Sequence, residues 1–273
     1  MARLAVSSMF FHEYPLGEIF DFVAEAELDS LEFWVETPHF WLREQPVHEL
    51  CACIKAHPGL SPLTVHGPIL DLNPCSINPK VAAVSVHYTL AAVELAEAAG
   101  ADVLTVHPGR RTAKRPPSAP DFRRFDHYIR ELDDAVQGKR VRVAIENMER
   151  KVNSLLCTPE TVREILDQEP WLWFTLDVSH AMGESVEEVF SYIDLCADRL
   201  ATVHLGKADG GTMHLPVDGS ARIAAVLHYL ERAGFNGTIT FEIEDRNFVH
   251  DLSSEEKTLF LRDQARFVRS LVG

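Results

Sequence analysis

The amino-acid sequence predicts an α/β fold in which eight strand–helix units form a single (β/α)8 barrel. Short apolar runs alternate strictly with stretches of helical spacing, which indicates a parallel sheet with helices outside it. The length of 273 residues is close to the roughly 250 residues that such barrels commonly have. We therefore expect one domain over residues 1–273, with the active site at the carboxyl ends of the strands. An open doubly wound sheet is disfavoured because no glycine-rich phosphate-binding motif follows the first strand.

The first four units consist of apolar runs that are each followed by a stretch with helical spacing. Their expected ranges are strand 4–10, helix 16–27, strand 31–35, helix 47–56, strand 63–66, helix 79–100, strand 103–106 and helix 122–136. Asn78 before Pro79 is a typical helix start, and Gly100 is a typical residue just after a helix end. An aromatic loop is expected at residues 39–41, after the second strand.

The last four units repeat this pattern. Their expected elements are strand 141–145, a helix that opens at 158–160, strand 172–176, a helix capped at 185, strand 200–203, helix 223–232, strand 238–241 and a helix from 253 to about 271. Ser185 with Glu188, and Ser253 with Glu256, have the spacing of a capping box, in which each side chain satisfies the other's backbone N–H. Both pairs therefore predict helix starts.

The composition is that of an ordinary globular protein, with 46% hydrophobic and 25% charged residues. The net charge of −15 argues against a broadly basic surface for nucleic acid. The five cysteines have irregular spacing and no CxxC pair, so we expect no disulfide framework. The N-terminus lacks the layout of a signal peptide, and no apolar run approaches the roughly 20 residues of a membrane span. We therefore expect a cytoplasmic protein without a membrane partner.

Acidic residues and histidines stand where the predicted strands end. Six strands end on, or are followed at once by, one such residue: His66, His107, Glu146, Asp177, His204 and Glu242. Because strand ends converge in a barrel, we expect these side chains to lie together, with His180 close by. Imidazole and carboxylate ligands without thiols suit Zn, Mn, Co or Fe.

Three of these residues are carboxylates, which would repel one another in one pocket without a cation. We therefore expect a divalent metal cofactor, Zn or Mn first, with one to three ions per chain. A carboxylate between two ions can bridge them, and Glu146 or Glu242 would suit that position. Metal ions there could polarise a sugar carbonyl or activate a water molecule.

Six motifs carry a resemblance to a known superfamily. They are Val65-His66-Gly67-Pro68, Val106-His107-Pro108-Gly109, Ile145-Glu146-Asn147, Leu176-Asp177-Val178-Ser179-His180, Val203-His204-Leu205 and Phe241-Glu242. In this order they resemble the xylose isomerase-like TIM barrel superfamily, over essentially the whole chain. Its members include sugar isomerases and epimerases, and the endonuclease IV class of abasic-site DNA repair enzymes.

The resemblance implies roles for individual residues. The metal quartet that epimerases and endonucleases share is matched by Glu146, Asp177, His204 and Glu242. His66 and His107 match the extra ligands by which endonuclease IV holds another zinc ion. His180 matches a substrate-binding residue of the epimerases and a ligand of the third zinc ion in the endonuclease.

Two departures distinguish the chain from endonuclease IV. That family has an Asp-x-His just before a glycine-containing turn. Here the turn is 215–219, His214 before it is offset by about one residue, and no acid stands at the matching place ahead of it. Where the endonuclease has a tyrosine that enters the DNA, this chain has Ile69. His214 before such a turn is similar to a pattern of the sugar-acting relatives, which implies that it binds substrate.

Further substrate contacts are expected near the mouth of the barrel. A basic loop follows the fourth strand and contains Arg110, Arg111, Lys114 and Arg115. This loop either binds a phosphate as a lid or lies free in solvent. Trp34, with the aromatic residues of 39–41, either packs on a sugar ring or a base, or seals the barrel mouth or a subunit contact. Lys207 either neutralises an enediolate or lies in solvent.

Two functions from different classes fit these residues. The first is an isomerase or epimerase of a small sugar, sugar acid or sugar phosphate. Glu146 and Glu242, expected on opposite sides of the barrel, would move a proton through an enediolate while His180 orients a hydroxyl. The second is a zinc phosphodiester hydrolase of abasic DNA, which His66 and His107 favour and the acidic charge disfavours. A barrel that only binds metal or sugar for regulation is a third alternative. We expect the first function, with a small sugar as the partner rather than nucleic acid.

Overall fold

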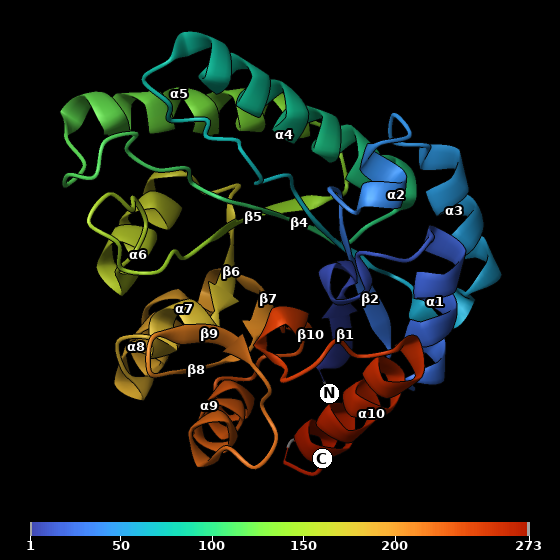
Figure 1. The fold of residues 1–273 in the computed structure, drawn as a ribbon. Helices are drawn as coiled ribbons and strands as arrows, with labels where there is room; N and C mark the ends of the chain where they lie inside the picture. Colours follow the sequence, from blue (N-terminus) through green and yellow to red (C-terminus); the bar gives the residue numbers. More distant parts are fainter. Residues whose placement is uncertain (1, 272–273) are drawn as a thin grey trace.

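The computed structural model describes residues 2–271, in which eight parallel strands form a closed barrel (Figure 1). The strands are β1 (Arg3–Ser7), β2 (Ser30–Trp34), β3 (Thr64–His66), β4 (Val103–Val106), β5 (Arg142–Glu146), β6 (Trp173–Asp177), β7 (Leu200–Leu205) and β10 (Thr238–Phe241). Each strand pairs with its predecessor in this order, and β10 closes the barrel by pairing with β1. The (β/α)8 architecture predicted from the sequence is thereby confirmed.

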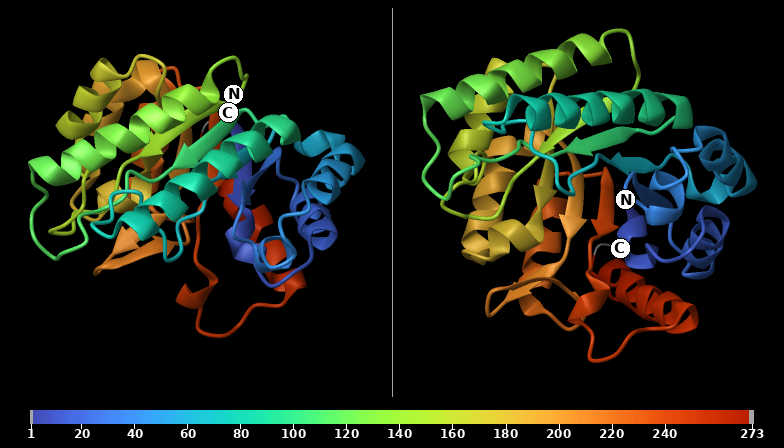
Figure 2. Two further views of the ribbon diagram at one scale, coloured as in Figure 1. Left: turned by 90° about the horizontal axis from the view of Figure 1, so that it is seen from above. Right: turned by 45° about the horizontal axis from the view of Figure 1, so that its top comes forward.

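Helices form a layer outside the barrel (Figure 2). The helices that follow the barrel strands are α1 (Leu16–Glu25), α3 (Val47–Ala56), α4 (Pro79–Ala99), α5 (Ala119–Val136), α6 (Pro159–Gln168), α8 (Val186–Cys196), α9 (Ala221–Arg232) and α10 (Ser254–Arg269). The last helix, α10, packs against α1 and so closes the outer ring. Short 3-10 turns occur at η1 (Ser8–Phe11), η2 (Pro58–Leu60), η3 (Ala197–Arg199) and η4 (Asp245–Asn247).

The alternation of side chains along each strand separates the core from the barrel interior. On β6, Phe174 and Leu176 belong to the buried apolar core, and burying each such side chain stabilises the fold by about 1.5–3 kcal/mol. Thr175 points into the barrel, where its hydroxyl lies 2.9 Å from that of Thr105 on β4, a strand that is not its neighbour. Asp177, two residues further, therefore also points inward, at the carboxyl end of the barrel.

Most helix boundaries were predicted from capping residues and glycines, and the structure confirms these boundaries. The Asn78 side chain accepts a hydrogen bond from the N–H of residue 80, and Gly100 ends α4 with a φ of 67°. Ser253 forms both halves of its capping box. The box predicted at Ser185 is only half formed, because the carboxylate of Glu188 pairs with Arg150 instead.

Two predictions near the N-terminus are wrong. The first strand ends at Ser7 rather than at residue 10, because Ser8 turns inward and its hydroxyl accepts a hydrogen bond from the N–H of Trp34. Residues 39–41 lie in a short helix, α2 (Pro38–Trp41), rather than in a loop. Proline at the first helical position, where no N–H is needed, favours that start.

Two further elements were not predicted. A short helix, α7 (Val178–Met182), begins directly after β6 instead of a loop. A hairpin of β8 (Lys207–Asp209) and β9 (Thr212–Leu215) follows β7, with a turn at Gly210 and Gly211. Both turn glycines have positive φ values, of 55° and 84°, which glycine adopts without steric cost.

Helix α4 is the described helix that is long and apolar enough to cross a membrane, with 21 residues and a mean hydropathy of 1.2. Its sequence does not form one continuous apolar run, because Glu94 and Glu97 interrupt its apolar residues. In the structure α4 packs on α3, α5 and β4, as one of the outer helices of the barrel.

Candidate active site

The ends of four adjacent strands bring the expected metal quartet together. Glu146 ends β5, Asp177 ends β6, His204 lies near the end of β7, and Glu242 follows β10. One ligand atom from each lies within 4.8 Å of the others. His204 Nδ1 lies 2.6 Å from Glu242 Oε2, 3.7 Å from Glu146 Oε1 and 4.0 Å from Asp177 Oδ2. Glu146 and Glu242 come from the first and last strands of this set, with β6 and β7 between them on one side of the ring and four strands on the other.

The quartet contains buried polar atoms that form no hydrogen bond of normal geometry with the described residues, although some lie close to one another, as His204 Nδ1 does to Glu242 Oε2. They are both carboxylate oxygens of Glu146, Asp177 Oδ2, His204 Nδ1 and Glu242 Oε2. Leaving a buried polar group unpaired costs about 1–3 kcal/mol, and a charged group costs more. Oxygen and imidazole nitrogen atoms that converge in this way suit a divalent cation such as Zn, Mn, Co or Fe. The residues present therefore fit the expected metal cofactor.

The charges of this cluster shift pKa values in opposite directions. Burial opposes the ionised form of Glu146, but His107 and His204 outweigh it and hold the pKa of that carboxyl well below its usual range. Burial also opposes the charged form of His204, yet Glu32, Glu242 and Glu146 raise the pKa of its imidazole well above its usual range. The cluster thus keeps the carboxylate of Glu146 ionised and favours positive charge at its centre, which a divalent cation would supply.

Asp177 and His180 are held in place by the first turn of α7. Asp177 Oδ1 accepts a hydrogen bond of 2.6 Å from the His180 N–H, as an N-cap residue does. The backbone of Asp177 exchanges bonds of 2.8 and 3.0 Å with the side-chain amide of Asn147. Burial raises the pKa of Asp177 to about 6, although His180 and His214 oppose that shift.

Two more histidines contact the second oxygen of Glu146. His107 Nε2 lies 3.0 Å and His66 Nε2 lies 3.5 Å from Glu146 Oε2. His66 Nδ1 donates to the carbonyl oxygen of Gly67 at 2.8 Å, so Nε2 is the atom that faces the glutamate. His66, His107 and Glu146 thus form a second group of ligand atoms, and this group shares Glu146 with the quartet.

The substrate-binding residues predicted from the sequence lie at different places. His214 lies next to His180, with ring centroids 5.3 Å apart, and forms a third ligand group with His180 and Asp177. Trp34 is buried at the end of β2. Lys207 is half-buried on β8, and its carbonyl accepts a hydrogen bond from the Ser179 hydroxyl. The structure therefore places His214 beside Asp177 of the quartet.

The two arginines at the start of the basic loop, Arg110 and Arg111, face different ways. Arg110 lines a cavity that also reaches His107. Arg111 instead donates to the carbonyl of Pro116 at 2.6 Å and lies 3.6 Å from the carboxylate of Asp121. Of this predicted pair, only Arg110 lies beside the candidate active site.

A family model described as a xylose isomerase-like TIM barrel matches residues 20–271. The chain belongs to this family. Two uncharacterized proteins of Methanocaldococcus jannaschii are similar to it. The first is 29% identical and covers 100% of both chains, and the second is 25% identical over 93% of this chain and 87% of its own length.

Several solved structures share the barrel at low sequence identity. A D-tagatose 3-epimerase-like protein is 23% identical, with a TM-score of 0.78 and coverage of 99% of this chain and 100% of its own. A 3-keto-D-glucoside 4-epimerase from E. coli is 17% identical, with a TM-score of 0.79 and the same coverage. An L-ribulose 3-epimerase is 19% identical, with a TM-score of 0.79 and coverage of 100% and 95%. At these identities the likeness shows a common fold.

Glu32, a fully buried residue in the middle of β2, belongs to the site of this xylose isomerase-like barrel but is not predicted from the sequence. Glu32 Oε2 lies 2.9 Å from His204 Nε2, across the barrel, and accepts a hydrogen bond of 3.2 Å from the Thr64 hydroxyl. Because Nε2 is engaged there, His204 directs Nδ1 at the quartet. The available signal was a single acid inside the apolar run 31–35.

We expect Glu32→Gln to weaken divalent-metal binding by about 10- to 100-fold, as is typical when the partner of a metal-binding histidine is replaced. The amide can still accept from Nε2 but no longer carries the charge that raises the pKa of His204. Titration calorimetry with Mn²⁺ measures the change. Glu36→Gln is the matched control, because Glu36 is also buried but binds the backbone at Ile69 instead. An unchanged Mn²⁺ affinity in Glu32→Gln would contradict this role.

Proposed function

We propose that the protein is a divalent-metal-dependent isomerase or epimerase of a small sugar. The observation that carries the proposal is the quartet, in which two glutamates flank an aspartate and a histidine within 4.8 Å. Structures of similar fold include a 3-keto-D-glucoside 4-epimerase and an L-ribulose 3-epimerase, which supports a sugar as the substrate class. Membership of the xylose isomerase-like family supports the same reaction class.

Under this proposal the metal ion is held by Glu146, Asp177, His204 and Glu242. When bound, a divalent cation draws electrons from the carbonyl and the adjacent hydroxyl of the sugar, and so acidifies the C–H bond of the carbon that bears the hydroxyl. A carboxylate beside that carbon can then remove the proton and leave an enediolate of the substrate.

Glu146 and Glu242 suit the two proton-transfer roles because they approach from the two outer strands of the quartet. One carboxylate removes the proton from one face of the carbon, and the other returns a proton to the opposite face, which inverts the centre. Return of the proton to the neighbouring carbon would instead interconvert an aldose and a ketose. Burial opposes the ionised form of both carboxyls, but His107 and His204 lower the pKa of Glu146, and His204 lowers that of Glu242. The ionised carboxylate accepts the proton from carbon, and the opposite carboxyl, protonated from solvent before the step, supplies the proton that is returned.

His180 suits the role of orienting a substrate hydroxyl. Its Nδ1 lies 2.9 Å from the carbonyl oxygen of Asn147, so Nε2 is the atom left for substrate. Burial opposes the charged form, but Asp177 and Glu146 raise the pKa of the imidazole. A protonated or neutral His180 can therefore donate from Nε2 or accept there, according to its charge.

The test is a panel of ketoses, aldoses and their phosphates, incubated with the Mn²⁺-loaded protein in D2O. The proposal predicts that at least one compound gives an epimer or isomer that carries solvent deuterium at the reacting carbon. Deuterium is expected because the carboxyl group that returns the proton has first taken up a deuteron from the solvent. Proton and carbon NMR measure both product and label. Failure of the whole panel to give product or exchange would contradict the proposal.

A zinc phosphodiester hydrolase is the second candidate. The observation that favours it is the second ligand group, because His66 and His107 both contact the oxygen of Glu146 that faces away from His204. The third ligand group favours it less, since the acid expected before His214 in an endonuclease IV-like site is absent from the sequence. Cleavage of duplex DNA with one abasic site by the zinc-loaded protein would favour this candidate over the first.

A further inference from the structure

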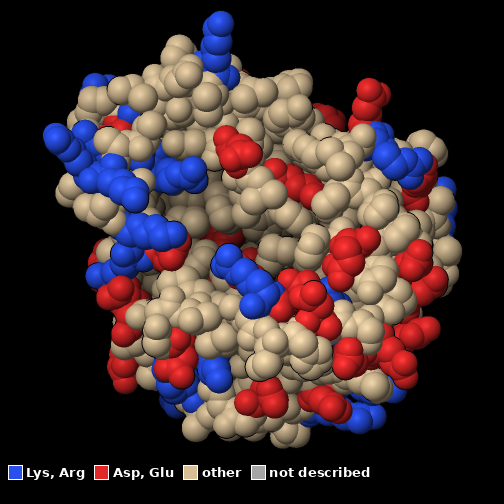
Figure 3. All heavy atoms as spheres, viewed as in Figure 1, with Lys and Arg blue, Asp and Glu red and all other residues tan. Residues whose placement is uncertain are grey.

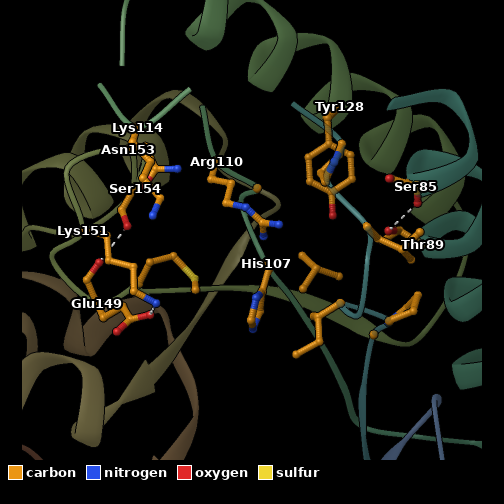
Figure 4. A pocket seen from close by; sticks show the side chains of 18 residues that line it. Ser85, Thr89, His107, Arg110, Lys114, Tyr128, Glu149, Lys151, Asn153 and Ser154 are labelled. Carbon is orange, nitrogen blue, oxygen red and sulfur yellow. Dashed lines mark hydrogen bonds and ion pairs between the residues drawn. The ribbon is translucent and has the colours of Figure 1, made fainter. Parts of the chain in front are cut away.

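A cavity of about 380 Å³ lies beside the candidate active site, between the loops that follow β3, β4 and β5. His107, whose Nε2 lies 3.0 Å from Glu146, forms part of its wall. Figure 4 shows Arg110 pointing into this cavity above His107, with Lys114 and Asn153 on one side and Tyr128 on the other. A ligand in the cavity would therefore have one end near the quartet and the other among cations.

The backbone that carries these cations is fixed by a network of hydrogen bonds. Residue 110 forms an antiparallel bridge with Ser154, and the N–H of Arg111 donates to the carbonyl of Asn153 at 3.0 Å. The Asn153 amide returns a bond of 2.8 Å to the carbonyl of Arg111. These bonds fasten the loop after β4 to the loop after β5. The start of the basic loop, residues 110 and 111, is thus fixed in the cavity wall, while residues 112–116 are exposed.

A second contact holds Arg110 from the other side of the cavity. The side chain of Asn73 accepts from the N–H of Arg110 at 3.0 Å and donates to its carbonyl at 2.9 Å. Gly109 makes this approach possible, because a Cβ there would lie 2.8 Å from Asn73 Oδ1. Gly109 also has a φ of 76°, a conformation that side chains disfavour.

The lining of the cavity has an excess of positive charge. Arg110, Lys114 and Lys151 line it with one carboxylate, Glu149, which pairs with Lys151. Within the described residues 2–271, Arg110 and Lys114 have no carboxylate within 4 Å. Two positive charges are therefore left over, in a protein whose net charge is −15. Figure 3 shows Lys and Arg gathered beside the N-terminal end of α5, while Asp and Glu dominate elsewhere on this face.

These charges match a phosphate monoester, which carries about 1.5 to 2 negative charges at neutral pH. Arginine donates a fork of N–H groups that suits phosphate oxygens, and lysine adds a second charge. We propose that the cavity binds the terminal phosphate of a small sugar phosphate whose sugar end lies at the quartet. This inference rests on the proposed function for the sugar end, and on the cavity for the phosphate.

The test compares ribitol with ribitol 5-phosphate by titration calorimetry on the Mn²⁺-loaded protein. Neither probe has a carbonyl, so neither is turned over. We expect the phosphate to bind about 10- to 100-fold more tightly than ribitol, as charge-assisted hydrogen bonds imply. Arg110→Gln with Lys114→Gln should remove this difference. Arg115→Gln is the matched control, because Arg115 is an exposed cation of the same loop that does not line the cavity.

Three results would overturn the inference. Equal affinities for ribitol and ribitol 5-phosphate would remove the phosphate site. Ribonate that binds as tightly as the phosphate, through the same two side chains, would reassign the site to a carboxylate. The third result is that abasic duplex DNA binds through Arg110 and Lys114 while ribitol 5-phosphate does not bind. That result would reassign the cavity to nucleic acid.

The calorimetric result is separable from the proposed reaction. Turnover of ketoses with no preference for phosphate in either assay would keep the isomerase or epimerase and reject the phosphate site. The opposite result is tighter binding of the phosphate that requires Arg110 and Lys114, with no turnover of any sugar or sugar phosphate. It would support the phosphate site and contradict the proposed isomerase or epimerase reaction.

Discussion

Replacement of Glu242 by Gln is expected to lower turnover by about 100- to 10,000-fold, the usual effect of losing a general acid or base. The amide keeps an oxygen that can face the metal site, so substrate binding should remain measurable. It cannot take up a proton, so one of the two proton transfers fails. Steady-state kinetics and substrate titration measure the two effects. Turnover at the wild-type rate would show that Glu242 is not the proton-transfer residue.

Deuterium exchange sharpens this prediction. With Glu146 intact, one of the two epimers should still exchange its C–H with D2O in Glu242→Gln, while the other should not. Asp177→Asn is the matched control, because it makes the same acid-to-amide change in the quartet at a residue with no proposed proton transfer. We expect Asp177→Asn to bind Mn²⁺ more weakly and to recover activity as Mn²⁺ is added. If added Mn²⁺ restored the activity of Glu242→Gln, Glu242 would be a metal ligand and not a proton-transfer residue.

Removal of divalent ions by dialysis against a chelator is expected to lower turnover by about 1,000-fold or more, since a metal ion supplies several kcal/mol of transition-state stabilisation. The buried carboxylates would then lose their cation, and the thermal midpoint should fall by about 5–10 °C. Addition of Mn²⁺, Co²⁺ or Zn²⁺ should restore both properties. Calorimetry and the D2O assay measure them.

The control for chelation is the Glu32→Gln variant, which should lose its metal at a lower chelator concentration than the wild type. Full activity of a preparation in which elemental analysis finds no divalent metal would contradict metal dependence. A lower midpoint with full activity would confine the ion to a structural role.

The barrel and the quartet could be predicted because their signals are local and repeat along the chain. Each apolar run is a strand, and the parallel barrel then places the residue at each strand end at one mouth. Glu146, Asp177 and His204 were located in this way before any contact was known. The order of the strands around the barrel is equally predictable, and it separates Glu146 from Glu242 by two strands.

The features that the sequence did not predict depend on tertiary contacts. Glu32 looks like an isolated acid within a strand, and its role follows only from His204, 172 residues away. The short helix α7 is stabilised by the Asp177 side chain, which the sequence analysis assigned to metal alone. Composition does not show which of Arg110 and Arg111 faces the cavity. Neighbouring side chains can point in opposite directions, and the contacts of the loop decide which one points inward.

Metal content per chain tests the central claim most directly, by elemental analysis of protein purified without chelators or a metal-binding tag. The quartet predicts about one divalent ion per chain, such as manganese or cobalt, with a clear reduction in Asp177→Asn. Two or three zinc ions per chain would contradict this account. His66 and His107 would then be working ligands, and abasic DNA rather than a sugar would be the first substrate to test.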